Sequence, residues 1–124
     1  MKFLHAMIRV TDIKKSLKFY QELFDLNLVN EMKLQDCTLY FLADQDGQTQ
    51  IELTANNENP DGGYEIGSGF GHFAFGVDSI DNFTEKMHDL GYAYMYEPYK
   101  LEGYDLKIAF LKDPDGYEIE IIEG

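Results

Sequence analysis

The segment HAMIRVTDI at residues 5–13 returns later in the chain as HFAFGVDSI at residues 72–80, and this repeat predicts the architecture. Both copies begin with histidine, alternate apolar residues, and carry valine and isoleucine at matching places. Further matches follow in the same order: LYFLAD 39–44 with IAFLKD 108–113, the Asp-x-Asp-Gly turns at 44–47 and 113–116, and IEL 51–53 with IEI 119–121. The offset between the copies stays between 67 and 69 residues in all of these matches. A duplicated module with small loop insertions produces this pattern.

Each copy predicts the order strand, helix and three strands. Residues 3–10 and 71–77 alternate as strands, and apolar residues at helical spacing follow, namely Ile13, Leu17, Tyr20, Leu23 and Phe24, then Ile80, Phe83, Met87 and Leu90. Asp12 or Thr11 caps the first helix and Asp78 or Ser79 the second, which ends at Gly91. The remaining strands are expected at 27–34, 37–43 and 49–54, then 92–97, 105–111 and 117–122. Hairpin turns fall at residues 46–47 and 115–116, and the polar stretch 56–63 is the linker.

Composition bounds the class of protein. The 124 residues are 44% hydrophobic and 27% charged, as in a globular single domain. The formal charge of -13 disfavours nucleic acid and anionic membranes as partners. The single cysteine, Cys37, excludes an internal disulfide framework and fits a reducing compartment, and no apolar run reaches membrane-spanning length. We therefore expect a cytoplasmic protein without a signal peptide.

Four side chains with metal-binding chemistry occupy repeated positions. Side chains alternate between the two faces of a strand, so His5, Glu52, His72 and Glu120 all fall on the face opposite the apolar one. Imidazole together with carboxylate suits Zn²⁺, Ni²⁺, Co²⁺ or Fe²⁺, whereas Mg²⁺ and Ca²⁺ prefer oxygen ligands. The only arginine, Arg9, points to the same side as His5.

Other polar and aromatic residues have ordinary structural interpretations. His88 lies on the polar side of the second helix, and Glu118 and Glu123 lack repeat partners, so we assign all three to the solvated surface. We interpret Cys37 as a small buried residue. The tyrosines of the second half either stack on a ligand or pack against neighbours; they are Tyr92, Tyr94, Tyr96, Tyr99 and Tyr104.

Four segments together resemble glyoxalase I, also called lactoylglutathione lyase, of the vicinal oxygen chelate superfamily. They are LHAMIRVTDIKKSLKFY 4–20, IELT 51–54, GFGH 69–72 and DPDGYEIE 113–120. The resemblance implies an α+β fold of two βαβββ modules that form a cup-shaped eight-stranded mixed sheet with helices on the outer face. It implies a single domain over residues 1–124, built from repeats at about 3–55 and 69–122, and a homodimer with the metal at its interface.

The resemblance also implies residue roles and a reaction. The family's metal ligands fall on His5, Glu52, His72 and Glu120, and Glu120 resembles the base that shuttles the proton. The family's contacts to the glutamyl carboxylate of glutathione fall on Arg9 and Asn56. The substrate is the hemithioacetal of methylglyoxal and a small thiol, and the product is the S-lactoyl thioester. Because the chain lacks the long insertions of zinc-dependent members, Ni²⁺ or Co²⁺ is favoured, with Zn²⁺ as the alternative.

Two departures from the family pattern concern the thiol. Ser68 precedes the GFGH motif where many eukaryotic members carry arginine, and Glu102 stands where relatives often supply lysine to the glycine carboxylate of glutathione. Lys100 is a candidate substitute. The thiol is therefore glutathione or another low-molecular-weight thiol, such as bacillithiol.

Three other activities of the same superfamily are alternatives. A methylmalonyl-CoA epimerase resembles the present pattern but has glutamine where this chain has Glu52. An extradiol dioxygenase uses two histidines and one carboxylate on iron, and leaves positions open for oxygen. A binding module of the bleomycin-resistance kind needs no metal. A fourth protein ligand argues against the dioxygenase and the binding module.

Overall fold

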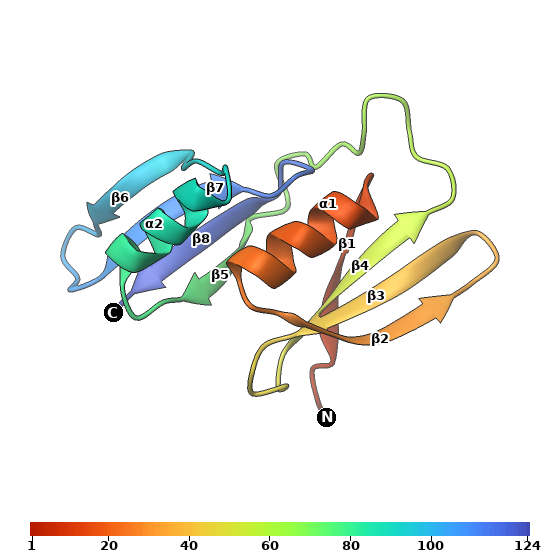
Figure 1. The fold of residues 1–124 in the computed structure, drawn as a ribbon, viewed down its shortest axis with the longest axis horizontal. Coiled ribbons are helices and arrows are strands. Elements are labelled where there is room, and N and C mark those ends of the chain that lie inside the picture. Colours follow the sequence, from red (N-terminus) through yellow and green to blue (C-terminus); the bar gives the residue numbers. More distant parts are fainter. The chain divides into compact units, whose positions relative to one another are not determined.

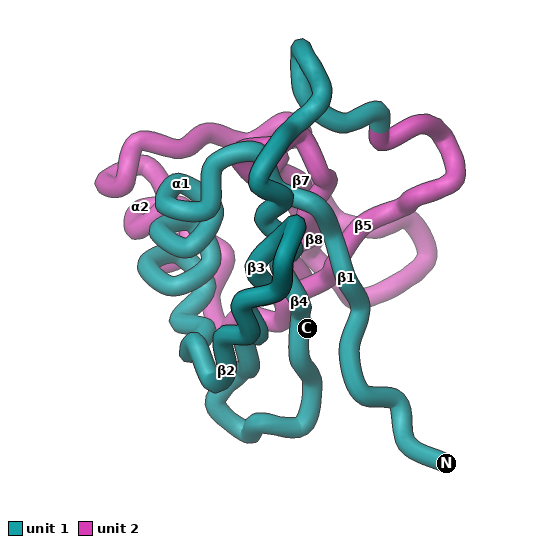
Figure 2. Tube along the Cα trace, turned by 90° about the vertical axis from the view of Figure 1, so that its right-hand side faces the viewer, with its two compact units in different colours: residues 1–65 teal, residues 66–124 magenta.

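The computed structural model describes all residues, 1–124, and divides into two compact units, Met1–Glu65 and Ile66–Gly124 (Figure 2). The first unit contains β1 (His5–Arg9), α1 (Ile13–Lys18), the π-helical segment η1 (Phe19–Leu23), β2 (Asn27–Lys33), β3 (Cys37–Ala43) and β4 (Gln50–Asn56), shown in Figure 1. Its four strands form one sheet in the order β1-β4-β3-β2. The outer pair β1 and β4 is parallel, and the other two pairs are antiparallel.

The second unit repeats this topology. It contains β5 (His72–Gly76), α2 (Ile80–Asp89), β6 (Tyr96–Lys100), β7 (Lys107–Lys112) and β8 (Glu118–Glu123). The sheet order is β5-β8-β7-β6, with β5 and β8 parallel. The α+β class and the βαβββ module predicted from the repeats are thus confirmed, and the eight strands form two four-stranded sheets. Neither helix is long and apolar enough to cross a bilayer.

Each sheet buries one set of alternating side chains. In the first unit the buried strand residues include Ile8, Leu42, Ile51 and Leu53. In the second unit they include Ala109, Leu111, Ile119 and Ile121. The residues between them in sequence project from the opposite face, as strand geometry requires. This alternation presents His5 with Glu52 on one face of the first sheet, and His72 with Glu120 on the equivalent face of the second.

Side-chain caps fix where the helices begin. The Asp12 carboxylate accepts a hydrogen bond from the Lys15 backbone amide at 3.2 Å, and the Ser79 hydroxyl accepts one from the Asn82 amide at 3.1 Å. Of the two candidate caps for each helix, these are the ones used. Gly91 follows Leu90, the C-cap of the second helix, with φ of +90°, a conformation that favours glycine.

The first helix departs from the predicted periodicity near its C-terminal end. Phe19 and Ser16 are fully buried, whereas Leu17, expected on the apolar stripe, is only half-buried. A π-helical segment follows from Phe19, and its wider turn changes the phase of the side chains after that residue. Tyr20 and Leu23 remain in the core as expected.

The sixth strand lies later in the chain than the predicted range 92–97. The Tyr92 amide donates to the Met87 carbonyl at 3.0 Å, which ties this residue to the end of α2. The hydroxyl groups of Tyr94 and Thr84, the latter on α2, are hydrogen-bonded at 2.7 Å. Pairing with β7 begins after these contacts: the Met95 amide donates to the Phe110 carbonyl at 2.7 Å. The strand itself starts at Tyr96, and its register shifts before Tyr99. Pro98, which has no amide hydrogen, lies within that shift.

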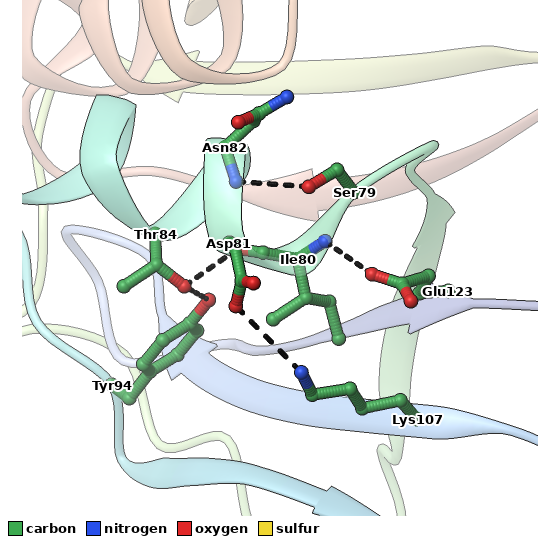
Figure 3. Close-up of polar contacts among 8 residues, drawn as sticks. All are labelled: Ser79, Ile80, Asp81, Asn82, Thr84, Tyr94, Lys107 and Glu123. Atoms are coloured by element: carbon green, nitrogen blue, oxygen red, sulfur yellow. Dashed lines mark hydrogen bonds and ion pairs between the residues drawn. The ribbon is translucent and has the colours of Figure 1, made fainter.

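The N-terminus of α2 is held by side chains from two strands, as Figure 3 shows. The Glu123 carboxylate at the end of β8 accepts a hydrogen bond of 2.6 Å from the Ile80 amide. Lys107 on β7 lies 3.7 Å from Asp81. The assignment of Glu123 to the solvated surface is therefore wrong, because its carboxylate satisfies an otherwise unpaired amide in the first helical turn.

Tyr94 belongs to the segment that leads into β6, and its hydroxyl reaches Thr84 of α2 (Figure 3). Burial raises the pKa of the Tyr94 phenol, and the negative charges of Glu97 and Asp81 raise it further, whereas the hydrogen bond with Thr84 lowers it. Tyr94 thus serves as a packing residue, one of the two roles considered for the tyrosines of this half.

We predict that Glu123→Ala lowers the free energy of unfolding by about 1 kcal/mol, because the Ile80 amide loses a charged acceptor. Urea unfolding followed by circular dichroism measures the change. Glu102→Ala removes the same charge from an exposed turn of the same unit and is the matched control. Equal effects of the two substitutions would contradict the capping role.

Candidate functional site

In the first unit a histidine and a glutamate meet on neighbouring parallel strands. His5 Nε2 lies 3.1 Å from Glu52 Oε1. The register pairs His5 with Gln50 and Met7 with Glu52, so the imidazole reaches diagonally to the next residue on the same face. The histidine side chain is 34% exposed and the glutamate side chain only 10%. The Glu52 carboxylate is therefore the more buried member of the pair, and the His5 imidazole is the more exposed one.

The second unit repeats the pair with one side chain from each equivalent strand. His72 Nε2 lies 3.6 Å from Glu120 Oε1, and the side chains are 41% and 16% exposed. The register is also equivalent, with His72 opposite Glu118 and Ala74 opposite Glu120. The strand positions inferred from the repeats therefore bring histidine and glutamate together within each unit.

A phenylalanine packs edge-on against each histidine. The ring centroids of His5 and Phe41 are 5.3 Å apart, and those of His72 and Phe110 are 5.5 Å apart. The register places each phenylalanine directly beside the glutamate of its unit. These apolar walls restrict the orientation of the imidazoles. Sequence reasoning missed their role, although the phenylalanines are equivalent within the repeated LYFLAD and IAFLKD segments.

The first pair has an additional partner that the second lacks in its equivalent position. The Thr54 hydroxyl donates a hydrogen bond of 2.6 Å to Glu52 Oε2, so the two carboxylate oxygens face different groups. Thr54 is buried. The signal for this contact was the spacing of two residues in IELT, which puts both side chains on one face.

The two residues expected to bind the thiol also belong to the first unit. Arg9 is exposed at the end of β1, opposite Thr54 in the register. Asn56 ends β4, and its side-chain amide donates to the Tyr64 hydroxyl at 3.0 Å. The Tyr64 hydroxyl in turn donates to Asn59 at 2.8 Å, which orders the segment after β4.

The other residues considered from sequence take mostly surface positions. Lys100 lies 3.6 Å from Asp105 in an exposed ion pair, and His88 is exposed on α2. Cys37 is a half-buried free thiol at the start of β3. Tyr96 is exposed, and its ring is 6.0 Å from that of Phe110.

The donor chemistry of the two pairs fits a transition-metal cation. Each pair offers an imidazole nitrogen and a carboxylate oxygen, a combination that suits Ni²⁺, Co²⁺, Zn²⁺ or Fe²⁺. No third histidine, cysteine or acidic side chain joins either pair to make a metal-binding group. One pair alone therefore falls short of the three protein ligands that catalytic metal sites usually have.

Comparison with known families gives a match over nearly the whole chain. A family model described as the Glyoxalase/Bleomycin resistance protein/Dioxygenase superfamily matches residues 2–121. A probable lactoylglutathione lyase of Synechocystis sp. is 39% identical over 127 residues, which cover 99% of this chain and 95% of that protein. A lactoylglutathione lyase of Haemophilus influenzae is 40% identical over 128 residues, which cover 100% of this chain and 93% of that protein.

Solved structures give the same result. Glyoxalase I from Zea mays superposes with a TM-score of 0.87 at 33% identity, and the match covers 99% of this chain and 44% of that one. The chain thus spans less than half the length of the maize protein. A trypanothione-dependent glyoxalase I from Leishmania major has a TM-score of 0.81 at 31% identity, with 99% of this chain and 86% of that one covered.

Proposed function

The chain belongs to the Glyoxalase/Bleomycin resistance protein/Dioxygenase superfamily, and on that premise we propose that it is a lactoylglutathione lyase that detoxifies methylglyoxal. It converts the hemithioacetal of methylglyoxal and glutathione, or another small thiol, to the S-lactoyl thioester. The observation that carries the proposal is the histidine–glutamate pair that recurs at the same register in both units. The lyases of Synechocystis and Haemophilus, similar over nearly their whole lengths, support the same reaction.

The cofactor in this proposal is one divalent transition metal per site, held by His5, Glu52, His72 and Glu120. Nickel or cobalt is favoured, and zinc is the alternative. When bound, such a cation supplies Lewis-acid polarisation of the two adjacent oxygens of the hemithioacetal, which makes the carbon between oxygen and sulfur more acidic.

The carboxylates supply the proton transfer. Methylglyoxal and the thiol form the hemithioacetal without the enzyme. The Glu120 carboxylate removes the proton from C1, the carbon bonded to sulfur, which leaves an enediolate. The same carboxyl group returns a proton to C2 from its own oxygen, and the hydroxyl proton of C1 moves to the C2 oxygen. The carbon–sulfur bond stays intact, so the product is the isomeric thioester.

Arg9 and Asn56 are proposed to bind the thiol portion. Both end neighbouring parallel strands on the face that carries His5 and Glu52, and a guanidinium there attracts a carboxylate. The ammonium group of Lys100, the candidate partner for the glycine carboxylate of glutathione, forms an exposed ion pair with Asp105. A relative from Leishmania major uses trypanothione, so several thiols belong in the assay.

We further propose that the two units act as a single domain and that two chains form a cytoplasmic homodimer. Each unit contributes only two metal ligands, so a complete site requires two units, from one chain or from two. A single cysteine fits a reducing compartment. Closed two-fold symmetry is the commonest arrangement of such assemblies.

We predict that the purified protein binds about one transition-metal ion per site, with the four proposed ligands required. His72→Ala and Glu52→Ala should each lower the bound metal measured by plasma mass spectrometry. His88→Ala removes an exposed histidine away from both pairs and is the matched control. Unchanged metal content in the first two variants would refute the ligand assignment.

We predict that Glu120→Gln lowers turnover of the hemithioacetal by about 10²–10⁴-fold at saturating metal, because an amide cannot accept the C1 proton. Glu52→Gln should act mainly through weaker metal affinity, with a smaller loss of turnover. Saturation with metal is required, since loss of a ligand otherwise imitates loss of a base. Near-native turnover of Glu120→Gln beside an inactive Glu52→Gln would reverse the two roles.

We predict that two inactive proteins complement each other in a hybrid dimer. One carries His5→Ala with Glu52→Ala, and the other carries His72→Ala with Glu120→Ala. If each site takes one unit from each chain, the hybrid has one intact site and recovers about half of the wild-type turnover. Co-expression with two affinity tags isolates the hybrid. An inactive hybrid, or an active monomer by light scattering, would place the site within one chain.

A further inference from the structure

We propose that Thr54 is a positioning residue that locks Glu52 as a fixed metal ligand, and that Ile122 at the equivalent place leaves Glu120 mobile enough to act as the base. The inference rests on the proposed lyase function, since it assigns different tasks to the two glutamates of that site. The two glutamates occupy equivalent backbone positions but have different neighbouring side chains.

The backbone equivalence of Thr54 and Ile122 follows from two hydrogen bonds and two registers. The Val10 amide donates to the Thr54 carbonyl at 3.1 Å, and the Val77 amide donates to the Ile122 carbonyl at 2.9 Å. Thr54 lies opposite Arg9, and Ile122 lies opposite Gly76, at the same step of the parallel ladder. Thr54 and Ile122 therefore differ in their side chains while sharing one place in the backbone ladder.

Glu52 is held through both carboxylate oxygens. Oε1 faces His5 at 3.1 Å and Oε2 accepts the Thr54 hydroxyl at 2.6 Å. The side chain is 10% exposed, and Thr54 is itself buried. A short bond to an ionised acceptor within a buried strand fixes the rotamer. Met7 lies opposite Glu52 on β1.

Glu120 has a less crowded setting. Its Oε1 lies 3.6 Å from His72, a longer separation than in the first unit. Ile122 offers only a hydrocarbon side chain where Thr54 offers a hydroxyl. The neighbours on β5 are Ala74 and Gly76, where the first unit has Met7 and Arg9. A methyl group built on Gly76, which lies opposite Ile122, would meet no atom within 4 Å, so β5 is open next to Ile122.

This difference matches the two tasks that the reaction requires. A metal ligand binds its metal more tightly when its orientation is fixed, because hydrogen-bond partners of the ligand commonly determine metal affinity. A base that takes a proton from C1 and returns it to C2 must move between two carbon atoms. A carboxylate bound at both oxygens resists that movement, whereas one without a second hydrogen-bond donor does not.

The first experiment measures metal affinity rather than turnover. Thr54→Val keeps the shape of the side chain and removes the hydroxyl, and Thr54→Ser keeps the hydroxyl. Titration of the metal-free protein with Ni²⁺ by calorimetry should show binding weakened about 10-fold or more in Thr54→Val and restored in Thr54→Ser. Thr38→Val makes the same change on the opposite face of the sheet and should leave the affinity unchanged.

The second experiment introduces a hydroxyl group next to Glu120, at the position equivalent to Thr54. Ile122→Thr should lower kcat at saturating metal about tenfold, with KM little changed, because Glu120 becomes tethered. The isotope effect on kcat with C1-deuterated hemithioacetal should rise, because proton transfer becomes slower relative to the other steps. Ile122→Val has the shape of threonine without the hydroxyl and should keep both kcat and the isotope effect of the wild type.

The outcomes separate this inference from the proposed function. A wild-type protein that binds no Ni²⁺ and does not isomerise the hemithioacetal overturns both. An active wild type with unchanged metal affinity in Thr54→Val overturns the lock alone. Equal kcat values for Ile122→Thr and Ile122→Val likewise overturn the mobile role of Glu120 and leave the lyase function standing. The second experiment decides the matter if Thr54→Val fails to fold.

Discussion

The parallel pairing of the first and last strands of each unit is the constraint on which the site depends. Parallel neighbours are joined by a crossover, here a helix and a hairpin of two strands, which leaves the open face of the sheet free of connecting helix. The register then puts histidine one step away from glutamate on that face. A slip of one residue would turn every functional side chain to the apolar face, so burial of the other face protects the site geometry.

Much of this arrangement could be predicted from the sequence because duplication doubles the signal. Strand alternation in the repeats was enough to place His5 beside Glu52 on one face, and side-chain distances now support that placement. The later start of β6 could not be read from its tyrosines, since a contact of Tyr94 with the preceding helix delays the strand. The cap from Glu123 escaped notice because it joins segments far apart in sequence.

The two units illustrate how a duplicated module can keep one backbone and diverge in function. Hydrogen-bond registers are the same at both glutamates, while their immediate neighbours differ in size and polarity. Whole-chain similarity to lactoylglutathione lyases indicates the type of reaction, and does not itself distinguish the two carboxylates. That distinction comes from local contacts, above all the hydroxyl that faces Glu52 and the hydrocarbon that stands near Glu120.

The parallel pairing also has a consequence for the order of events during folding. His5 lies in the first strand of its unit and Glu52 in the last, so almost the entire unit must be synthesised before the two can meet. Closing such a long loop costs chain entropy that local hairpins do not incur, which makes this pairing a late step. A growing chain on the ribosome thus carries an isolated imidazole until the fourth strand emerges. The sheet and the histidine–glutamate pair are therefore completed in the same step. Chains that lack the fourth strand bind metal ions only weakly, because they offer a single imidazole.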